Sequence, residues 1–423
     1  MRILRPSFLV AALMLLGYRM AVAQQPLSWD QLKARFEATN PALKADADLV
    51  DEMRAQEITA YLRPNPQLGI SVDGTQIAPR NGVWQPLSGT FVSPGISYLH
   101  ERDHKRELRQ QSAQEGTHVS ESQHDDLRRT LEFTLRTAFI NTLEAKAVLD
   151  LAKTGLEYYD HILDISRVRL RDGDIAQMDF DRIELFRVQY ESELQTAIVN
   201  LRTAKLQLLQ LLNDRTPVDQ FDVTGTFDFS PSLPPLDDFR QNALTSRPDL
   251  QAALQAAQQA DTNHKLAIAN GSTDPVFGTW YTWNPSTNNP NATQTLGISA
   301  SIPLRFFDRN QGEKKRTQID IDRSQQAADA VRAQVFSDVD SSYATVQSSI
   351  ELLKPYKAKY NNQALRVREA VTYAYQNGGA SLLEFLNAQS DYRQVQLAYT
   401  QLIAAYLTAA AQLNQAVGRE VIQ

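Results

Sequence analysis

The feature that most limits the fold of this chain is a long stretch without helix-breaking residues. Between Glu101 and Arg171 there is no proline, and the glycines stand alone. An α-helix rises about 1.5 Å per residue, so about 70 residues would form a helix roughly 105 Å long. A compact hydrophobic core does not enclose a helix of this length. A second long helix is predicted from Gln311 to Tyr375, where Pro355 indicates a kink rather than an end.

The chain also repeats itself. The sequence Arg171-Asp172-Gly173 corresponds to Gln376-Asn377-Gly378, and Asp179-Phe180 corresponds to Glu384-Phe385. After each pair, apolar residues are spaced alternately four and three apart, as in helices that supercoil around neighbours. The two sets are Tyr190, Leu194, Ala197, Leu201, Ala204, Leu208 and Leu211, and Val395, Tyr399, Leu402, Tyr406, Ala409, Leu413 and Ala416. We therefore predict a first repeat over residues 24–213, an irregular proline-rich connector over 214–238, and a second repeat over 239–423.

Four segments alternate apolar and polar residues as β-strands do. They lie at 67–73, 92–98, 276–283 and 296–302, two in each repeat. We expect each strand to run for about 9–11 residues, the length with which a tilted strand crosses a bilayer. Ordinary hairpins in a soluble sheet would show the same periodicity. Because four strands cannot close a barrel and open edges are not tolerated in lipid, the membrane interpretation requires several copies of the chain.

The N-terminus predicts export. Arg2 and Arg5 precede an apolar run over 8–16, and Ala21-Val22-Ala23 has the small residues of a cleavage site. We expect a signal peptide over residues 1–23. Beyond it, no stretch approaches the roughly 18 apolar residues that a membrane-spanning helix needs.

Composition removes several classes of function. The chain has no cysteine, which excludes thiolate metal sites, cysteine nucleophiles, disulfides and acylation at a cysteine. Its 43 Lys+Arg and 49 Asp+Glu give a net charge of −6, so no nucleic acid partner is expected.

One short motif has the form of a zinc-protease signature. His100-Glu101-Arg102-Asp103-His104 fits H-E-x-x-H, which in such enzymes lies within a helix under an active-site cleft. Here the motif falls where a strand meets a helix, among charged residues. The better interpretation is a charged rim between the strands and the helices. The other histidines are scattered and form no ligand set.

Taken in order, these elements resemble the TolC-type outer membrane efflux proteins. Asn65-Pro66 ends a helix before the first strand, and Arg247-Pro248-Asp249-Leu250 opens the helix that leads to the third strand. The run from Pro303 to Gly312 follows the fourth strand, and its Phe-Asp-Arg-Asn-Gln-Gly part is most similar to the cobalt-zinc-cadmium efflux subgroup. The likeness covers essentially all of the chain beyond the signal peptide.

The resemblance implies a mainly α-helical fold with a small β part. Three copies of the four strands would make one twelve-stranded transmembrane β-barrel, and the long helical hairpins would form a trimeric α-barrel in the periplasm of a Gram-negative-type cell. The homotrimer would be a passive exit duct, fed by an inner-membrane pump of the resistance-nodulation-division type through a periplasmic adaptor. No catalytic residue, cofactor or metal is expected. Without cysteine there would be no lipid anchor, so the shared barrel would hold the protein in outer membrane lipid.

The resemblance also points to the helical tips. In the family, glycine turns lie at the periplasmic tip, where adaptor hairpins dock. The matching residues are Gly173, Gly378 and Gly379. A tight turn between helices favours glycine, which accepts a positive φ at little cost.

The predicted gate lies beside these tips. Glu384 matches an aspartate that lines the constriction of the family, and a ring of three such carboxylates would favour cations and raise its own pKa by mutual repulsion. Asn387 matches the next acid, so the second ring would be uncharged. A hydrogen bond between Tyr375 and Asp179, worth about 1–2 kcal/mol, would latch the two hairpins. The basic partner of the family falls on Ala380 and is therefore absent.

Two other functions stay open on the sequence. One is a secreted zinc metallopeptidase that uses His100, Glu101 and His104. The other is an exported coiled-coil scaffold without a pore.

Overall fold

The computed structural model describes residues 25–283 and 293–422. The predicted signal peptide over 1–23 lies outside the described residues. The chain divides into two compact units, each assembled from separate stretches of sequence. Unit 1 comprises Met1–Lys44, Leu127–Ser246 and Phe336–Gln423, and unit 2 comprises Ala45–Asp126 and Arg247–Val335. Each unit therefore takes residues from both predicted repeats.

Unit 2 contains an antiparallel sheet with the strand order β1-β2-β3-β4. The strands are β1 (Gln67–Asp73), β2 (Phe91–Leu99), β3 (Val276–Trp283) and β4 (Gln294–Ser301). All four predicted strands are present; β2 has 9 residues, as expected, whereas β1, β3 and β4 have 7 or 8 and are shorter than expected. β1 ends at Asp73 because Gly74 turns the chain with φ +78° and packs against the carbonyl of Gly89. Trp280 of β3 lies over Gly297 of β4, where a Cβ would collide with its ring.

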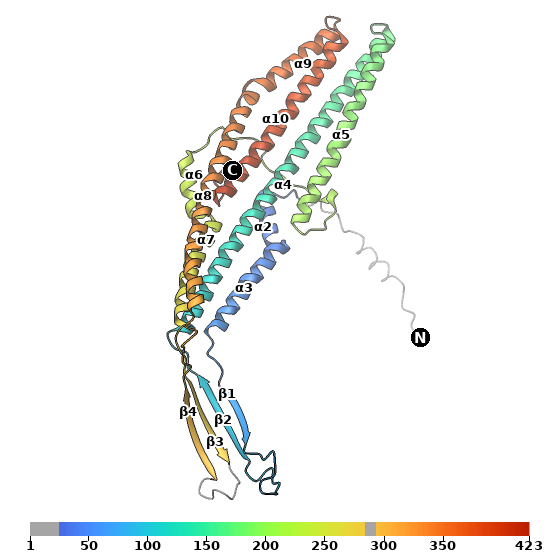
Figure 1. The fold of residues 1–423 in the computed structure, drawn as a ribbon. Helices are drawn as coiled ribbons and strands as arrows, with labels where there is room; N and C mark the ends of the chain where they lie inside the picture. The colour runs from blue at the N-terminus through green and yellow to red at the C-terminus, as the bar shows by residue number, and fades with distance from the viewer. Residues whose placement is uncertain (1–24, 284–292, 423) are drawn as a thin grey trace, which may run out of the picture. The chain divides into compact units, whose positions relative to one another are not determined.

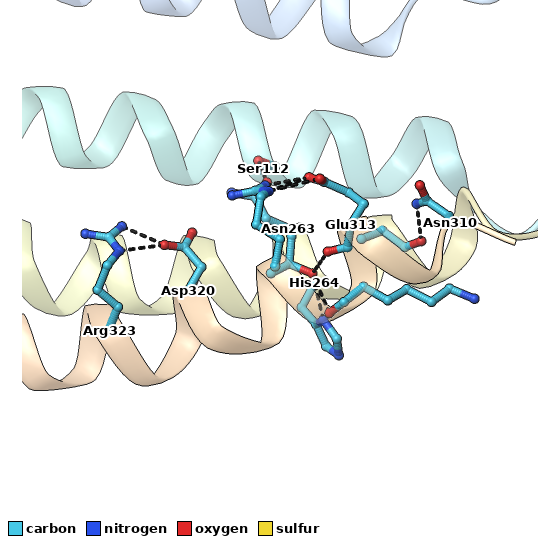
Figure 2. Close-up of polar contacts among 11 residues, drawn as sticks. Ser112, Asn263, His264, Asn310, Glu313, Asp320 and Arg323 are labelled. Carbon is cyan, nitrogen blue, oxygen red and sulfur yellow. Dashed lines mark hydrogen bonds and ion pairs between the residues drawn. The ribbon is translucent and has the colours of Figure 1, made fainter. Parts of the chain in front are cut away.

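The helices of unit 2 contact one another through polar side chains. They are parts of α3 (Pro41–Tyr61), α4 (Lys105–Asp172) and α8 (Gln311–Pro355), together with α7 (Pro248–Ala269). Figure 2 shows Ser112 of α4 beside Asn263 of α7, to which it donates a hydrogen bond of 2.6 Å. The next residue, His264, lies 2.9 Å from the hydroxyl of Thr317 on α8.

Unit 1 is helical. It holds α2 (Trp29–Thr39), α5 (Gln177–Leu211), η1 (Val218–Gln220), α6 (Leu236–Ser246), α9 (Asn361–Gln376) and α10 (Leu382–Val417), with the remaining parts of α4 and α8. Figure 1 shows α4 beside α5 and α9 beside α10, so each pair forms a helical hairpin. Most of the predicted heptad residues face the interior, since Tyr190, Ala197, Ala204, Leu208, Tyr406, Ala409, Leu413 and Ala416 are buried.

The connector is tied into the core of unit 1. Its Val223 pairs with Leu27 in a short parallel bridge, and both Val223 and Phe221 are buried against α2, α4 and α5. Asp222 lies 2.8 Å from the amine of Lys146 and 3.0 Å from that of Lys205. The helix α6 begins at Leu236, inside the segment that the sequence predicts to be irregular.

The kink predicted at Pro355 is a π-helical turn. α8 ends at Pro355, the turn η2 covers Tyr356–Tyr360, and α9 continues from Asn361. Proline lacks an N–H and its ring collides with the preceding turn, so the helix widens locally. Lys357 in this turn donates to both carboxylate oxygens of Asp228, at 2.9 and 2.7 Å.

In the parts of the chain that the structure describes, no helix is both long enough and apolar enough to cross a membrane. The predicted fold class, mainly helical with a small sheet of four strands, is confirmed.

Candidate functional site

The two helical hairpins of unit 1 end in glycine turns. Gly173, between α4 and α5, has φ +84°, and Gly378, between α9 and α10, has φ +73°. A side chain in this left-handed region costs about 1–2 kcal/mol, which explains the choice of glycine. Gly379 does not have a positive φ, and its N–H donates to the carbonyl of Ala374 at 2.7 Å. Gly173 and Gly378 therefore form the turns, whereas Gly379 contributes a backbone hydrogen bond that caps the end of α9.

Beneath the turns, side chains of both hairpins form one apolar cluster. Its buried members are Tyr159, Ile162, Leu163, Ile183, Tyr190, Tyr375 and Phe385. Tyr159 of α4 and Tyr190 of α5 stack within the first hairpin, with ring centroids 4.8 Å apart. Burial raises the pKa of the Tyr159 phenol, whose hydroxyl has no hydrogen-bond partner among the described residues. Since the cluster joins the hairpins, separating them would expose aromatic surface.

Tyr375 is the centre of the contact between the hairpins. Its ring stacks on Phe385 with a centroid distance of 4.8 Å, and the guanidinium of Arg169, from the first hairpin, lies 5.2 Å from its ring centroid. Arg169 also donates to the carbonyl of Tyr375 at 3.3 Å. The structure therefore brings an arginine of α4 to the tyrosine that precedes the second tip. Arginine is suited to this because it can donate hydrogen bonds while stacking on an aromatic face.

The hydrogen bond expected between Tyr375 and Asp179 is not formed. The Tyr375 hydroxyl is buried and lacks a hydrogen-bond partner among the described residues. Burial raises the pKa of this phenol; the charge of Arg169 opposes the shift and that of Asp179 adds to it. Asp179 is half-buried in the first turn of α5, where a carboxylate is favoured by the helix dipole. The negative charge of Asp179 acts on the Tyr375 phenol electrostatically. The position of the Tyr375 ring is set by stacking on Phe385 and Arg169.

Glu384 has a structural role within its own helix. Ser381 caps α10, and the carboxylate of Glu384 accepts hydrogen bonds from the Ser381 N–H at 2.7 Å and from its hydroxyl at 2.8 Å. These bonds form a capping box. They lower the pKa of the exposed Glu384 carboxyl, so within one protomer the shift is opposite to that expected for a carboxylate ring. Asn387, one turn later, is also exposed.

Two further arginines connect the hairpins, and sequence reasoning missed them. Arg368 of α9 lies over the rings of Tyr158 from α4 and Tyr392 from α10, at 4.6 and 4.0 Å. Arg393 of α10 forms an ion pair of 2.9 Å with Glu193 of α5. No local motif marks these residues, because each partner is more than a hundred positions away or on another helix. Ala380, where the family has a basic residue, belongs to the apolar cluster instead.

A cavity of about 700 Å³ lies among the same helices. Its walls come from α4, α5, α9 and α10 and include Arg368, Arg393 and Glu144. Burial raises the pKa of the Glu144 carboxyl. Most of the other lining side chains are small or polar, so the hairpins pack less tightly here than at the apolar cluster.

The zinc-protease motif does not form a metal site. His104 precedes the first residue of α4 and has φ +56°, so the two histidines do not share a helix face. Glu101 is bound by the guanidinium of Arg109 through two contacts of 2.5 and 3.0 Å. Across residues 25–283 and 293–422, no group of three or more His, Asp or Glu side chains is placed to hold a metal ion.

Comparison with known proteins gives the family. Residues 239–419 match the outer membrane efflux protein family. The matched residues make up most of the second half of the chain. The cobalt-zinc-cadmium resistance protein CzcC of Cupriavidus metallidurans is 22% identical over 402 residues, which cover 94% of this chain and 91% of that protein. The likeness to CzcC therefore extends through the first half, and the resemblance inferred from the sequence is confirmed.

Solved structures of membrane channels have the same fold. A structure of CusC, described with conformational changes that accompany folding and transmembrane channel formation, has a TM-score of 0.78 at 19% identity and covers 92% of both chains. The open state of the MtrE outer membrane channel of Neisseria gonorrhoeae has a TM-score of 0.75 at 18% identity, covering 93% of this chain and 89% of that one.

Proposed function

We propose that this protein is the outer membrane channel of a tripartite efflux system, a passive trimeric exit duct without catalytic chemistry. The observation that carries the proposal is the four-stranded sheet, whose outer strands β1 and β4 each pair on one side alone within the described residues. Apolar residues on them are exposed, with Leu68 at 75%, Leu296 at 76% and Ile298 at 84%. Unpaired edges and apolar faces are unstable in water and, if left open, in lipid.

Three copies would resolve both problems. Pairing β4 of one protomer with β1 of the next would give twelve strands in a closed barrel, with the apolar side chains toward lipid. The helical hairpins, contributed by repeats 24–213 and 239–423 around the connector 214–238, would enclose the periplasmic α-barrel. A signal peptide over 1–23 would export the chain to the outer membrane. The match to an efflux family supports this arrangement.

The hairpin tips would receive the partners. A periplasmic adaptor would dock on the turns at Gly173, Gly378 and Gly379, and an inner-membrane pump, of the resistance-nodulation-division type, would supply the energy. The exposed tips leave backbone and polar groups available for such contacts. The similarity to CzcC suggests divalent metal ions as the first cargo to test.

The contact between the hairpins would be the gate. In the closed state, Tyr375 is held by Arg169 and Phe385, and Asp179 contributes its charge nearby. Three copies of Glu384 would surround the constriction and favour cations, while Asn387 would add a neutral ring. The stacked geometry of Tyr375, rather than a hydrogen bond to Asp179, supports this version of the gate.

The test combines mass and conductance. The protein extracted in detergent should have the native mass of a trimer and should form cation-preferring channels in planar bilayers. A monomer without conductance would favour the coiled-coil scaffold. Casein cleavage that depends on Glu101 would favour the zinc peptidase. If Glu384→Gln loses the cation preference and keeps the mass of a trimer, Glu384 acts in ion selectivity and not in assembly of the trimer.

A further inference from the structure

A basic aromatic segment follows the last strand. It covers residues 302–309, and its apolar side chains are strongly exposed, with Ile302 at 55%, Leu304 at 74%, Phe306 at 67% and Phe307 at 93%. Such exposure of large apolar side chains in one short segment indicates an interaction surface. The family match and the proposed channel do not by themselves assign a partner to it.

The strand register places this segment at one end of the sheet. Leu99 pairs with Val276, and Val276 pairs with Ser301, so β2 ends, β3 begins and β4 ends at the same level. The helices of unit 2 adjoin this end, since Lys105 begins α4 a few residues beyond β2. The segment therefore continues directly from the proposed membrane-facing strand toward the helices.

Several cationic side chains gather at this end of the sheet. Lys105 is paired with Asp274 at 2.6 Å, and Arg109 is paired with Glu101, so these charges are neutralised within unit 2. Arg106 is paired with Glu107 at 2.9 Å. By contrast, four other arginines at this end form no ion pair with a described residue. They are Arg63, Arg102, Arg305 and Arg309, of which all but Arg305 are exposed. The Arg309 guanidinium donates to the carbonyl of Arg305 at 3.3 Å. Because no described carboxylate holds these four guanidinium groups in an ion pair, their charges are available to an external anion.

The opposite end of the sheet has a different composition. The loop over residues 74–90, which joins β1 to β2, carries Arg80 as its one charged residue. It also exposes apolar side chains, including Ile77 at 93%. Exposed apolar residues therefore occur at both ends, whereas the excess of unpaired arginine is confined to the end next to the helices.

We propose that the basic aromatic segment, with Arg63 and Arg102, binds anionic phospholipid headgroups of the membrane leaflet on the helix side. This rests on the proposed channel, which places the strands in a bilayer. The phenylalanine rings would lie at the level of the headgroups, where aromatic residues are favoured in membrane proteins. The arginines would bind lipid phosphates, since guanidinium groups match phosphate oxygens in geometry and charge. The segment thus provides a lipid contact beyond the strands themselves.

A photocrosslinking experiment tests the occupant directly. The full chain with Phe307→p-benzoylphenylalanine is reconstituted in vesicles of phosphatidylcholine and phosphatidylglycerol, irradiated, and analysed by mass spectrometry. Phe307 is nearly fully exposed, so the substitution should be tolerated. We expect phospholipid adducts in which phosphatidylglycerol is enriched over its bulk share. The same probe at Tyr373, exposed on α9, should give none.

Charge variants then test the source of the preference. Arg305→Gln with Arg309→Gln should lower the enrichment of phosphatidylglycerol by roughly 30-fold at most, the effect of two arginines near an anionic surface. High salt should reduce it as well. Arg80→Gln, at the other end of the sheet, is the matched control and should leave it unchanged.

The outcomes are distinct. Crosslinking of position 307 to a second copy of the chain would overturn the proposal and assign the segment to a protomer interface. Adducts without enrichment would overturn the role of the arginines. Conductance is measured on the same vesicles. If the vesicles conduct and position 307 forms no lipid adduct, the lipid proposal is wrong and the proposed channel function stands. If the vesicles do not conduct, the proposed channel function is rejected as well.

Discussion

The contact between Arg169 and Tyr375 predicts how the gate responds to substitution. Arg169→Gln removes a cation over the tyrosine ring and a hydrogen bond to its carbonyl. A cation–π contact is worth about 0.5–2 kcal/mol and a net hydrogen bond about 1 kcal/mol, so for a half-buried arginine the loss is about 2 kcal/mol. That shifts the balance between packed and separated hairpins by about 30-fold in each protomer. We expect a higher open probability.

Tyr375→Phe should act in the opposite direction. The hydroxyl is buried without a hydrogen-bond partner among the described residues, so the packed state carries the cost of removing it from water. Leaving such a group unsatisfied costs about 1–3 kcal/mol, and phenylalanine has nearly the same shape. The variant should therefore keep the hairpins packed and leave the open probability unchanged or lower.

Single-channel recording in planar bilayers measures both effects. Arg171→Gln is the matched control, because Arg171 lies on the same helix near the tip, is largely exposed, and has Asp172 at 3.5 Å as its ion-pair partner. It should behave as the wild type. If Tyr375→Phe opened the channel while Arg169→Gln did not, the phenol would have to form a hydrogen bond, as in a Tyr375–Asp179 latch, and stacking on Arg169 would not hold the gate.

Three further predictions concern stability and are read by thermal unfolding. Gly378→Ala should destabilise the protein by about 1–2 kcal/mol because of its positive φ, whereas Gly379→Ala should have little effect. Ser381→Ala removes a helix cap and should cost about 1 kcal/mol, and Ser381→Thr should restore most of it; equal stability of the two variants would contradict the capping role. Burial disfavours the Asp222 carboxylate, but its lysine partners outweigh this and lower its pKa. Its contribution is therefore present at neutral pH and is lost as pH falls below about 4, and Asp222→Asn should abolish that part of the acid transition.

Much of the fold follows from local patterns. The absence of proline from 101–171, the heptad spacing and the alternation in four segments are enough to predict long helices and four short strands. β1, β3 and β4 are shorter than predicted, and in β1 the reason is that Gly74 turns the chain directly after Asp73. The start of α6 was not predicted, because the prolines of the connector indicate an irregular segment. Pro234 and Pro235 in fact precede this helix and do not interrupt it.

The candidate site was only partly predictable. Family resemblance identified Tyr375, Asp179, Glu384 and the tip glycines, since turn chemistry and spacing are local. It did not identify Arg169 or Arg368, whose partners lie on another hairpin. It also could not show that Glu384 is engaged in a capping box, because the same Ser-x-x-Glu spacing is compatible with a carboxylate pointing into a pore.

The helical hairpins, the strands, the glycine turns and the family resemblance can be predicted from the amino-acid sequence, because each depends on residues close together in the chain. Which side chains meet across the hairpins, and which remain exposed, is visible in the folded structure alone. It replaced a Tyr375–Asp179 hydrogen bond with stacking on Phe385 and Arg169, paired Glu101 with Arg109, and left Phe307 93% exposed. Contacts of this kind depend on how distant segments pack, and spacing along the chain carries no record of that.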